Sequence, residues 1–255
     1  MSDALVDLLR LKYEPVGLFY FDEKPEGVFE FPAGKRNCVV SMILMASKGK
    51  PLVTYDDNCA CAGGAVALGF GNAFERRCHP TRYLLSTGVA EMTEDEWHKI
   101  PPHMMDGERF FRKPSVVDIW RESLPYGSDE DRYVLFAPQS QWPEDREPDV
   151  VILLLNPDQL SAVVCMGSFR TGKAMQTIAP FSAACQSILQ VRQDRNSADA
   201  PMVMGMFDVA QRHQLPANML SLTMSHDRFV QLSEDAPTSC LSSQSWKKLV
   251  RLREQ

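Results

Sequence analysis

Short apolar runs alternate with segments of helical periodicity along most of the chain. The segment 150–155 is the clearest predicted strand, because it is continuously apolar and begins with β-branched residues. Apolar runs predict further strands at 16–21, 52–55, 133–136, 202–207 and 219–224. Helical spacing, caps and stop signals predict helices at 4–12, 38–47, 65–68, 157–168, 181–192, 227–232 and 244–253. The alternation predicts an α/β fold class with a layered sheet and flanking helices; a mixed α+β arrangement is the alternative.

The chain contains no visible internal repeat and no low-complexity segment. Its middle part, 91–125, is charged and interrupted by prolines, and it predicts only one or two short helices. The polar stretch 194–200 could mark a domain boundary, but it is short. We therefore predict one domain over residues 1–255, a length sufficient to bury a sizeable core.

Composition and charge narrow the class of function. The formal net charge is -6, and no basic stripe is visible, so we expect neither nucleic acid nor an anionic membrane surface as a partner. No apolar run approaches the roughly 20 residues of a membrane-spanning helix, and the first residues lack a secretory pattern. We expect a cytoplasmic protein. In that compartment, the seven cysteines indicate metal binding or catalysis more than disulfides.

The sharpest local feature is the sequence Cys-Ala-Cys-Ala-Gly-Gly at 59–64, with Cys38 upstream. Thiolates are ligands of zinc and of iron–sulfur clusters. Gly63 and Gly64 add backbone freedom and remove side-chain bulk, and N–H groups in such a turn can stabilise negative sulfur. The alternative is that Cys59 and Cys61 are small buried residues beside an ordinary tight turn.

Other cysteines add candidates. Cys185 is predicted in the first turn of a helix, where the helix dipole lowers a thiol pKa. It is a third or fourth metal ligand, a reactive thiol, or a core residue. Cys78 and the adjacent His79 offer two further ligands, although a Cys-His pair in a proline-containing loop usually has no such role. Cys165 lies in an apolar stretch and is predicted to be in the core.

Established catalytic motifs are missing from the sequence: it has no H-E-x-x-H, G-x-S-x-G, G-x-G-x-x-G or phosphate-loop pattern. Arg212 follows a predicted strand and is our candidate for binding an anionic substrate or supporting the metal ligands. A structural salt bridge between Asp208 and Arg212 is the simpler interpretation of that pair.

Several segments together resemble domain-of-unknown-function family 169, an uncharacterised group of prokaryotic proteins. The resemblance covers most of the chain and is carried by 38–39, 61–64, 68–71, 84–88, 156–162, 184–188, 208–212 and 239–241. It implies that Cys38, Cys61 and Cys185 occupy the typical cysteine positions of the family, and it implies no activity. The chain departs from the family pattern at 77–80 and at Cys240, which places Cys78 and Cys240 outside the shared site.

Our leading hypothesis is a protein that binds one [4Fe-4S] cluster through Cys38, Cys61 and Cys185. Cys59 is then the fourth ligand or a nearby thiol, and Gly63 and Gly64 flank the cofactor. Three ligands would leave one iron open for lyase, sulfur-transfer or redox chemistry on a small molecule. Four ligands would favour electron transfer to a partner, or sensing.

Two alternatives remain from the sequence. The same thiolates could bind zinc in a metal-binding or metal-trafficking protein. The chain could also be a metal-free thiol enzyme or a small-molecule binding module, with Cys59 and Cys61 as a redox pair. Whether the chain is an enzyme is open in each case. A homo-oligomer is one expected assembly state.

Overall fold

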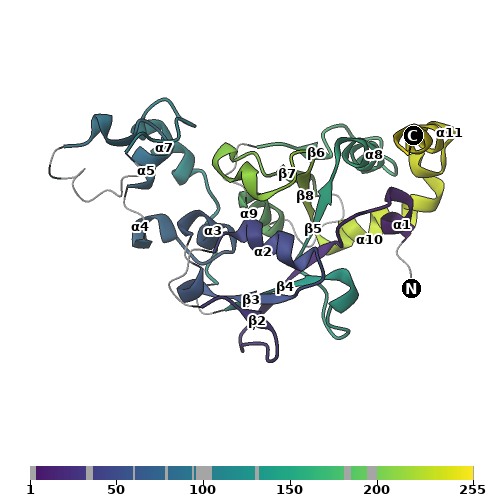
Figure 1. Ribbon diagram of the computed structural model, residues 1–255, viewed down its shortest axis with the longest axis horizontal. Helices are drawn as coiled ribbons and strands as arrows, with labels where there is room; N and C mark the ends of the chain where they lie inside the picture. The colour runs from purple at the N-terminus through teal and green to yellow at the C-terminus, as the bar shows by residue number, and fades with distance from the viewer. Residues whose placement is uncertain are drawn as a thin grey trace.

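The computed structural model describes residues 4–32, 37–59, 61–77, 80–93, 95, 105–129, 132–180, 185–193 and 200–254. The predicted α/β class is confirmed: one eight-stranded mixed open sheet carries helices on its two faces (Figure 1). Within these residues, no helix has both the length and the apolar character needed to cross a bilayer.

The strands follow the spatial order β2-β3-β4-β1-β5-β8-β7-β6. All neighbouring strands are antiparallel except β2 with β3 and β6 with β7, which are parallel. The strands are β1 (Val16–Phe21), β2 (Phe29–Glu30), β3 (Leu52–Thr54), β4 (Tyr133–Pro138), β5 (Val150–Leu155), β6 (Thr177–Ile178), β7 (Met202–Gly205) and β8 (Leu220–Met224).

The sheet has two halves of identical topology. In the first half β1 pairs with β4, β4 with β3, and β3 with β2; in the second half β5 pairs with β8, β8 with β7, and β7 with β6. The halves meet where β1 runs antiparallel to β5, with Gly17 opposite Val151. A two-fold rotation between these two strands therefore exchanges the halves. The sequence shows no such repeat, so the repetition is one of topology.

Each half contains a parallel strand pair joined by an eight-residue helix. Helix α2 (Val39–Ala46) connects β2 to β3, and helix α9 (Gln186–Gln193) connects β6 to β7. Cys38 directly precedes α2, and Cys185 directly precedes α9. The two cysteines therefore occupy equivalent positions in the two halves.

The helices divide between two apolar clusters on opposite faces of the sheet. On one face α2, α3 (Ala62–Ala67) and α9 pack on side chains such as Leu18 and Ile152. On the other face α1 (Ala4–Leu9), α8 (Pro157–Gly167) and α10 (His226–Asp235) pack on Leu153 and Leu222. Neighbouring residues of β5 thus point to opposite faces, as strand geometry requires.

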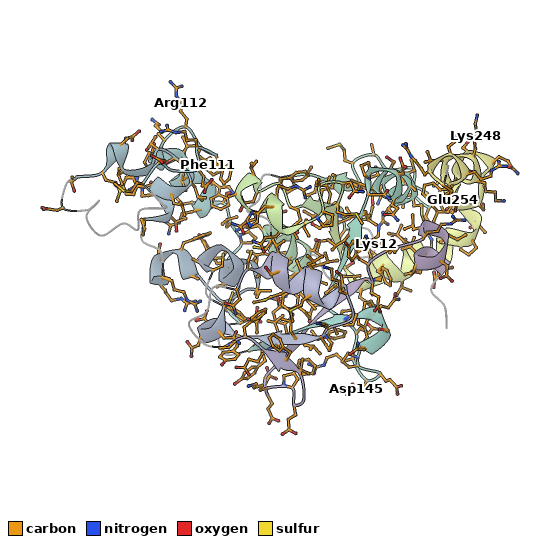
Figure 2. All side chains as sticks on the ribbon, viewed as in Figure 1. Lys12, Phe111, Arg112, Asp145, Lys248 and Glu254 are labelled. Atoms are coloured by element: carbon orange, nitrogen blue, oxygen red, sulfur yellow. The ribbon has the colours of Figure 1, made fainter. Side chains whose placement is uncertain are left out.

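The remaining helices lie at the two ends of the molecule. Helices α4 (Ala73–Arg77), α5 (Thr81–Leu84) and α7 (Pro114–Glu122) belong to the long connection between β3 and β4. Figure 2 shows Phe111 and Arg112 of this connection at one end, and Lys248 and Glu254 near α11 (Gln244–Arg253) at the other. Short 3-10 turns are η1 (Asp56–Asn58), η2 (Gly88–Glu91), η4 (Gln139–Gln141), η5 (Val209–Gln214), η6 (Ala236–Thr238) and η7 (Cys240–Ser242).

Several elements begin or end at other residues than the sequence predicted; helix α1, for example, ends at Leu9 and not at residue 12. Helix α3 begins at Ala62, earlier than the predicted 65–68. The predicted strand 202–207 ends at Gly205, because Met206 adopts a positive φ of 68° that no strand can contain. The predicted helix 181–192 and the polar stretch 194–200 lie partly outside the described residues.

Candidate functional site

Four cysteines from distant parts of the chain converge on the face of the sheet that α2, α3 and α9 cover. Burial raises the pKa of Cys185 well above its ordinary value, and Cys61, Cys38 and Cys59 raise it further. Cys38 in turn raises the pKa of Cys61, and Cys61 raises that of Cys59. The four sequence-predicted thiols therefore form one neighbourhood, in which Cys61 is coupled to each of the others.

Three of these cysteines stand at helix starts. Cys38 and Cys61 are the N-cap residues of α2 and α3, and Cys185 directly precedes α9. The Sγ of Cys61 accepts a hydrogen bond from the backbone N–H of Gly64 at 3.4 Å. The thiol of Cys185 donates to the carbonyl of Gly63 at 3.7 Å. Free N–H groups at a helix start favour the thiolate, the form that binds metals.

The loop that carries Cys59 is held in place by hydrogen bonds. The side-chain amide of Asn37 donates to the carbonyl of Asn58 at 2.5 Å, which joins the residue before Cys38 to the residue before Cys59. The guanidinium of Arg77 donates to the carbonyl of Cys59 at 2.5 Å. The first bond connects the two cysteine-bearing segments, and the second connects the Cys59 loop to α4.

Burial differs among the four thiols. Cys59 is 0% exposed, its thiol donates to the carbonyl of Cys61 at 3.8 Å, and burial raises its pKa to about 12. Cys61 is exposed to solvent, yet protein atoms surround it closely enough for desolvation to raise its pKa as well. Since a raised pKa lowers the thiolate fraction, Cys59 is poorly suited to act as a nucleophile or as half of a redox pair.

A buried carboxyl completes the charged surroundings. Asp208 is 8% exposed, and its side chain caps η5 by accepting a hydrogen bond from the backbone N–H of Ala210 at 2.9 Å. Asp208 raises the pKa of Cys38, Cys61 and Cys185, and burial raises its own pKa. From the sequence, Asp208 was interpreted as a salt-bridge partner of Arg212, because its burial is not visible there.

Gln186 lies at the site but was not among the residues predicted for it. Its side chain is 1% exposed, and neither atom of its amide has a hydrogen-bond partner in the described part of the chain. The Nε2 atom lies 3.8 Å from the position that a Cβ on Gly63 would take. Its sequence signals were its position directly after Cys185 and its place in the segment 184–188 that carries the family resemblance.

The two glycines of the motif differ in their surroundings. A Cβ on Gly64 would lie 2.8 Å from Cγ2 of Val39, closer than real Cβ atoms approach other atoms. At Gly63 the nearest atoms to such a Cβ would be 3.8 Å away, an ordinary contact. Gly64 is therefore required for the close packing of α3 on the start of α2, whereas Gly63 is not.

The guanidinium of Arg212 is hydrogen-bonded to backbone carbonyl groups. It donates to the carbonyl of Met219 at 2.7 Å and to that of Ala217 at 3.0 Å. These bonds hold the turn that leads into β8. The nearby Gln214 hydrogen-bonds the thiol of Cys38 instead, which lowers the pKa of that thiol against the larger effect of burial.

Two further cysteines lie on the opposite face of the sheet. Cys165 was predicted to be in the core, and this is wrong: it is exposed on α8. Cys240 is half-buried, and its thiol donates to the carbonyl of Ala162 at 3.6 Å. Cys78 and His79 lie outside the described residues.

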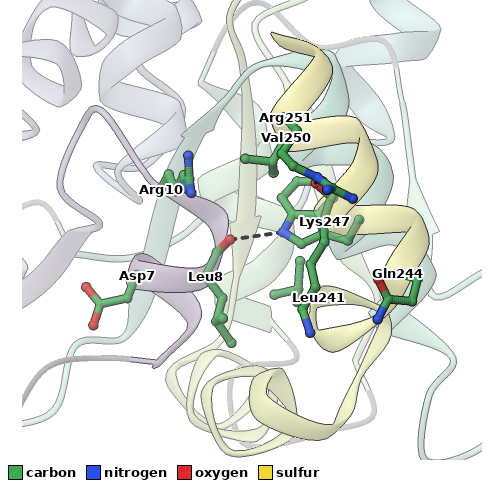
Figure 3. A pocket seen from close by; sticks show the side chains of 9 residues that line it. Asp7, Leu8, Arg10, Leu241, Gln244, Lys247, Val250 and Arg251 are labelled. Carbon is green, nitrogen blue, oxygen red and sulfur yellow. Dashed lines mark hydrogen bonds between the residues drawn. The ribbon is translucent and has the colours of Figure 1, made fainter. Parts of the chain in front are cut away.

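Two other surface features contain no cysteine. The side chains of Glu147, His226 and Asp227 place their ligand atoms within 4.8 Å of one another, but both carboxylates are exposed. A pocket of about 520 Å³ lies between α1 and α11 (Figure 3), where the indole of Trp246 donates to the carbonyl of Leu8 at 3.1 Å. Both features belong to elements on the face of the sheet opposite the four thiols.

A family model named DUF169, described as Uncharacterised ArCR, matches residues 4–235. The chain belongs to this family. No curated protein and no solved structure matches it. The DUF169 match includes all four converging cysteines and ends before Cys240 and α11.

Proposed function

We propose that this DUF169 protein binds a [4Fe-4S] cluster through Cys38, Cys61 and Cys185, with Cys59 packed beside it. The observation that carries the proposal is the convergence of these thiols from separate segments at helix starts. Cys38 and Cys185 stand at equivalent places in the two halves, and Cys61 lies on the segment between them. A site built in this way depends on segments that only the folded chain brings together.

The charges at the site favour a cationic occupant. The groups that most raise the pKa of Cys185 after burial are the other three thiols and Asp208, all of them acidic. Neutral thiols are tolerated together, but thiolates would repel one another and the carboxylate. A metal cation that replaces the thiol protons supplies the opposite charge, so ligand deprotonation and metal binding are coupled.

A four-iron cluster and a single zinc ion require different distances between their thiolate ligands. Four thiolates around one tetrahedral zinc, with Zn–S bonds of about 2.3 Å, lie about 3.8 Å from one another. In the described residues, no three of the four thiols all lie within 4.8 Å of one another. Thiolates around a four-iron cluster bind different iron atoms and so lie farther apart.

Three cluster ligands are favoured over four because the family resemblance implies Cys38, Cys61 and Cys185 as typical cysteine positions and does not include Cys59. A cluster held by three thiolates supplies one iron with an open position, which can act as a Lewis acid toward a small molecule. The exposure of Cys61 gives such a molecule, or an electron-transfer partner, access to this side of the site.

The test is anaerobic purification, followed by visible absorption and assays of iron, acid-labile sulfide and zinc on one sample. We expect broad visible absorption with about four iron and four sulfide per chain. Cys61→Ala should abolish bound iron, whereas Cys165→Ala, which removes an exposed cysteine on the other face, should retain it. A colourless protein with stoichiometric zinc would replace the cluster by a zinc site. A protein that stays metal-free after reconstitution with iron and sulfide would reject both.

A further inference from the structure

We infer that the side-chain amide of Gln186 is part of the cysteine site and donates an N–H hydrogen bond to a sulfur atom of the group held there. This inference rests on the proposed function and names a positioning residue for it. Gln186 is not a metal ligand in this arrangement, since an amide is a poor ligand for iron beside thiolates.

The first reason for this inference is the burial of the Gln186 amide without a hydrogen-bond partner in the described part of the chain. Gln186 is 1% exposed, and both Nε2 and Oε1 lack a hydrogen-bond partner among the described residues. A buried polar group without a partner destabilises a protein, and such groups in native structures generally have a ligand, ion or water beside them. The amide therefore indicates that a polar or ionic group belongs next to it.

The position of Gln186 indicates which polar or ionic group belongs beside its amide. Gln186 begins α9 directly after Cys185, and its Nε2 faces Gly63 of α3. The backbone of Gly63 contacts two proposed ligands: its N–H hydrogen-bonds the Cys61 sulfur, and its carbonyl accepts from the Cys185 thiol. The amide thus lies beside a residue whose own polar groups already serve two of the thiols.

The expected consequence concerns the reduction potential. An N–H donor to a cluster sulfur stabilises negative charge, and reduction by one electron from a chemical reductant adds negative charge to the cluster. The donor therefore stabilises the reduced form more than the oxidised form. Its removal should shift the potential of the cluster to a more negative value.

The experiment compares Gln186→Met and Gln186→Glu with wild type after anaerobic reconstitution, by redox titration followed by visible absorption. Both variants should load iron and show a more negative potential, with the larger shift in Gln186→Glu because it also adds negative charge. Gln190→Met is the matched control. It makes the same change one turn further along α9, at a side chain whose own amide oxygen also lacks a partner among the described residues, and it should leave the potential unchanged.

A second readout excludes a role in packing alone. In the metal-free chain, Gln186→Met replaces an unpaired buried amide by an apolar group, so its thermal midpoint should equal or exceed that of wild type. A lower midpoint would overturn the inference. So would an unchanged potential in fully loaded Gln186 variants, while the proposed function would stand. Both Gln186 variants could also lose the cluster while their metal-free chains keep the thermal midpoint of wild type. That result would support the inference, because it would show that the amide acts on the bound group and not on the packing of the chain. Failure of wild type itself to load would reject the proposed function.

Discussion

A Cβ on Gly64 would lie 2.8 Å from Cγ2 of Val39, so helix α3 approaches the start of α2 as closely as a glycine allows. Val39 follows Cys38 directly, and Gly64 donates its backbone N–H to the sulfur of Cys61. The contact between the two residues therefore sets how close the thiols of Cys38 and Cys61 lie. The packing of α3 against α2 therefore helps to determine the geometry of the cysteine site.

Gly64→Ala should lower both stability and iron content. The added methyl meets a β-branched side chain that cannot swing away, so we expect a loss of about 1–3 kcal/mol in the free energy of unfolding. Denaturant unfolding of the metal-free protein and iron per chain after reconstitution measure the two effects. Gly63→Ala is the control and should be neutral or slightly stabilising, since its methyl has room. Val39→Ala should rescue Gly64→Ala, and failure of the rescue would contradict this account.

Cys59→Ala should keep the cluster. Cys59 is enclosed in the core, and the removal of a small buried side chain should cost about 1 kcal/mol of stability. Iron and sulfide per chain should match those of wild type. A loss of one iron or of the whole cluster, in a variant that stays folded, would make Cys59 the fourth ligand and would favour electron transfer over small-molecule chemistry.

The metal-free protein should become less stable in alkali. Burial raises the pKa of all four thiols in the folded state, that of Cys59 from 9.0 to about 12. The folded chain therefore holds protons that the unfolded chain loses above about pH 9, and stability falls as the pH rises through this window. The slope should be on the order of 1 kcal/mol per pH unit for each such thiol.

Denaturant unfolding of wild type and Cys59→Ala from about pH 8 to pH 11 checks this expectation. The variant should lose stability less steeply, because one of the shifted groups is gone. Equal slopes would mean that the buried thiol of Cys59 ionises as easily in the folded chain as in the unfolded one.

The sequence predicted the long elements well, because their pattern is local. Strands β1 and β5 and helix α11 have the predicted bounds. Asn156 caps α8 through reciprocal hydrogen bonds with Gln159, at the start of the helix predicted at 157–168. The two-residue strands β2 and β6 were missed, since their only definition is pairing with β3 and β7. The repeated topology was missed for the same reason.

The candidate site was predicted in part. Cysteine is rare enough for Cys38, Cys61 and Cys185 to stand out in a sequence, and the structure brings them together. Gln186 and Asp208 are common residue types whose significance comes from burial, which no local pattern reveals. The positive φ of Met206, two residues before Asp208, was not predicted either, because residues other than glycine rarely adopt it.

The position of Cys38 and Cys185 in different halves has a mechanical consequence. A group bound to both cysteines joins the two halves in the folded chain. Because the unfolded chain holds no preformed site, the binding free energy of this group adds to the stability of the folded chain. Release of the bound group by oxidation would remove that contribution, so the cohesion of the seam between β1 and β5 would respond to oxygen.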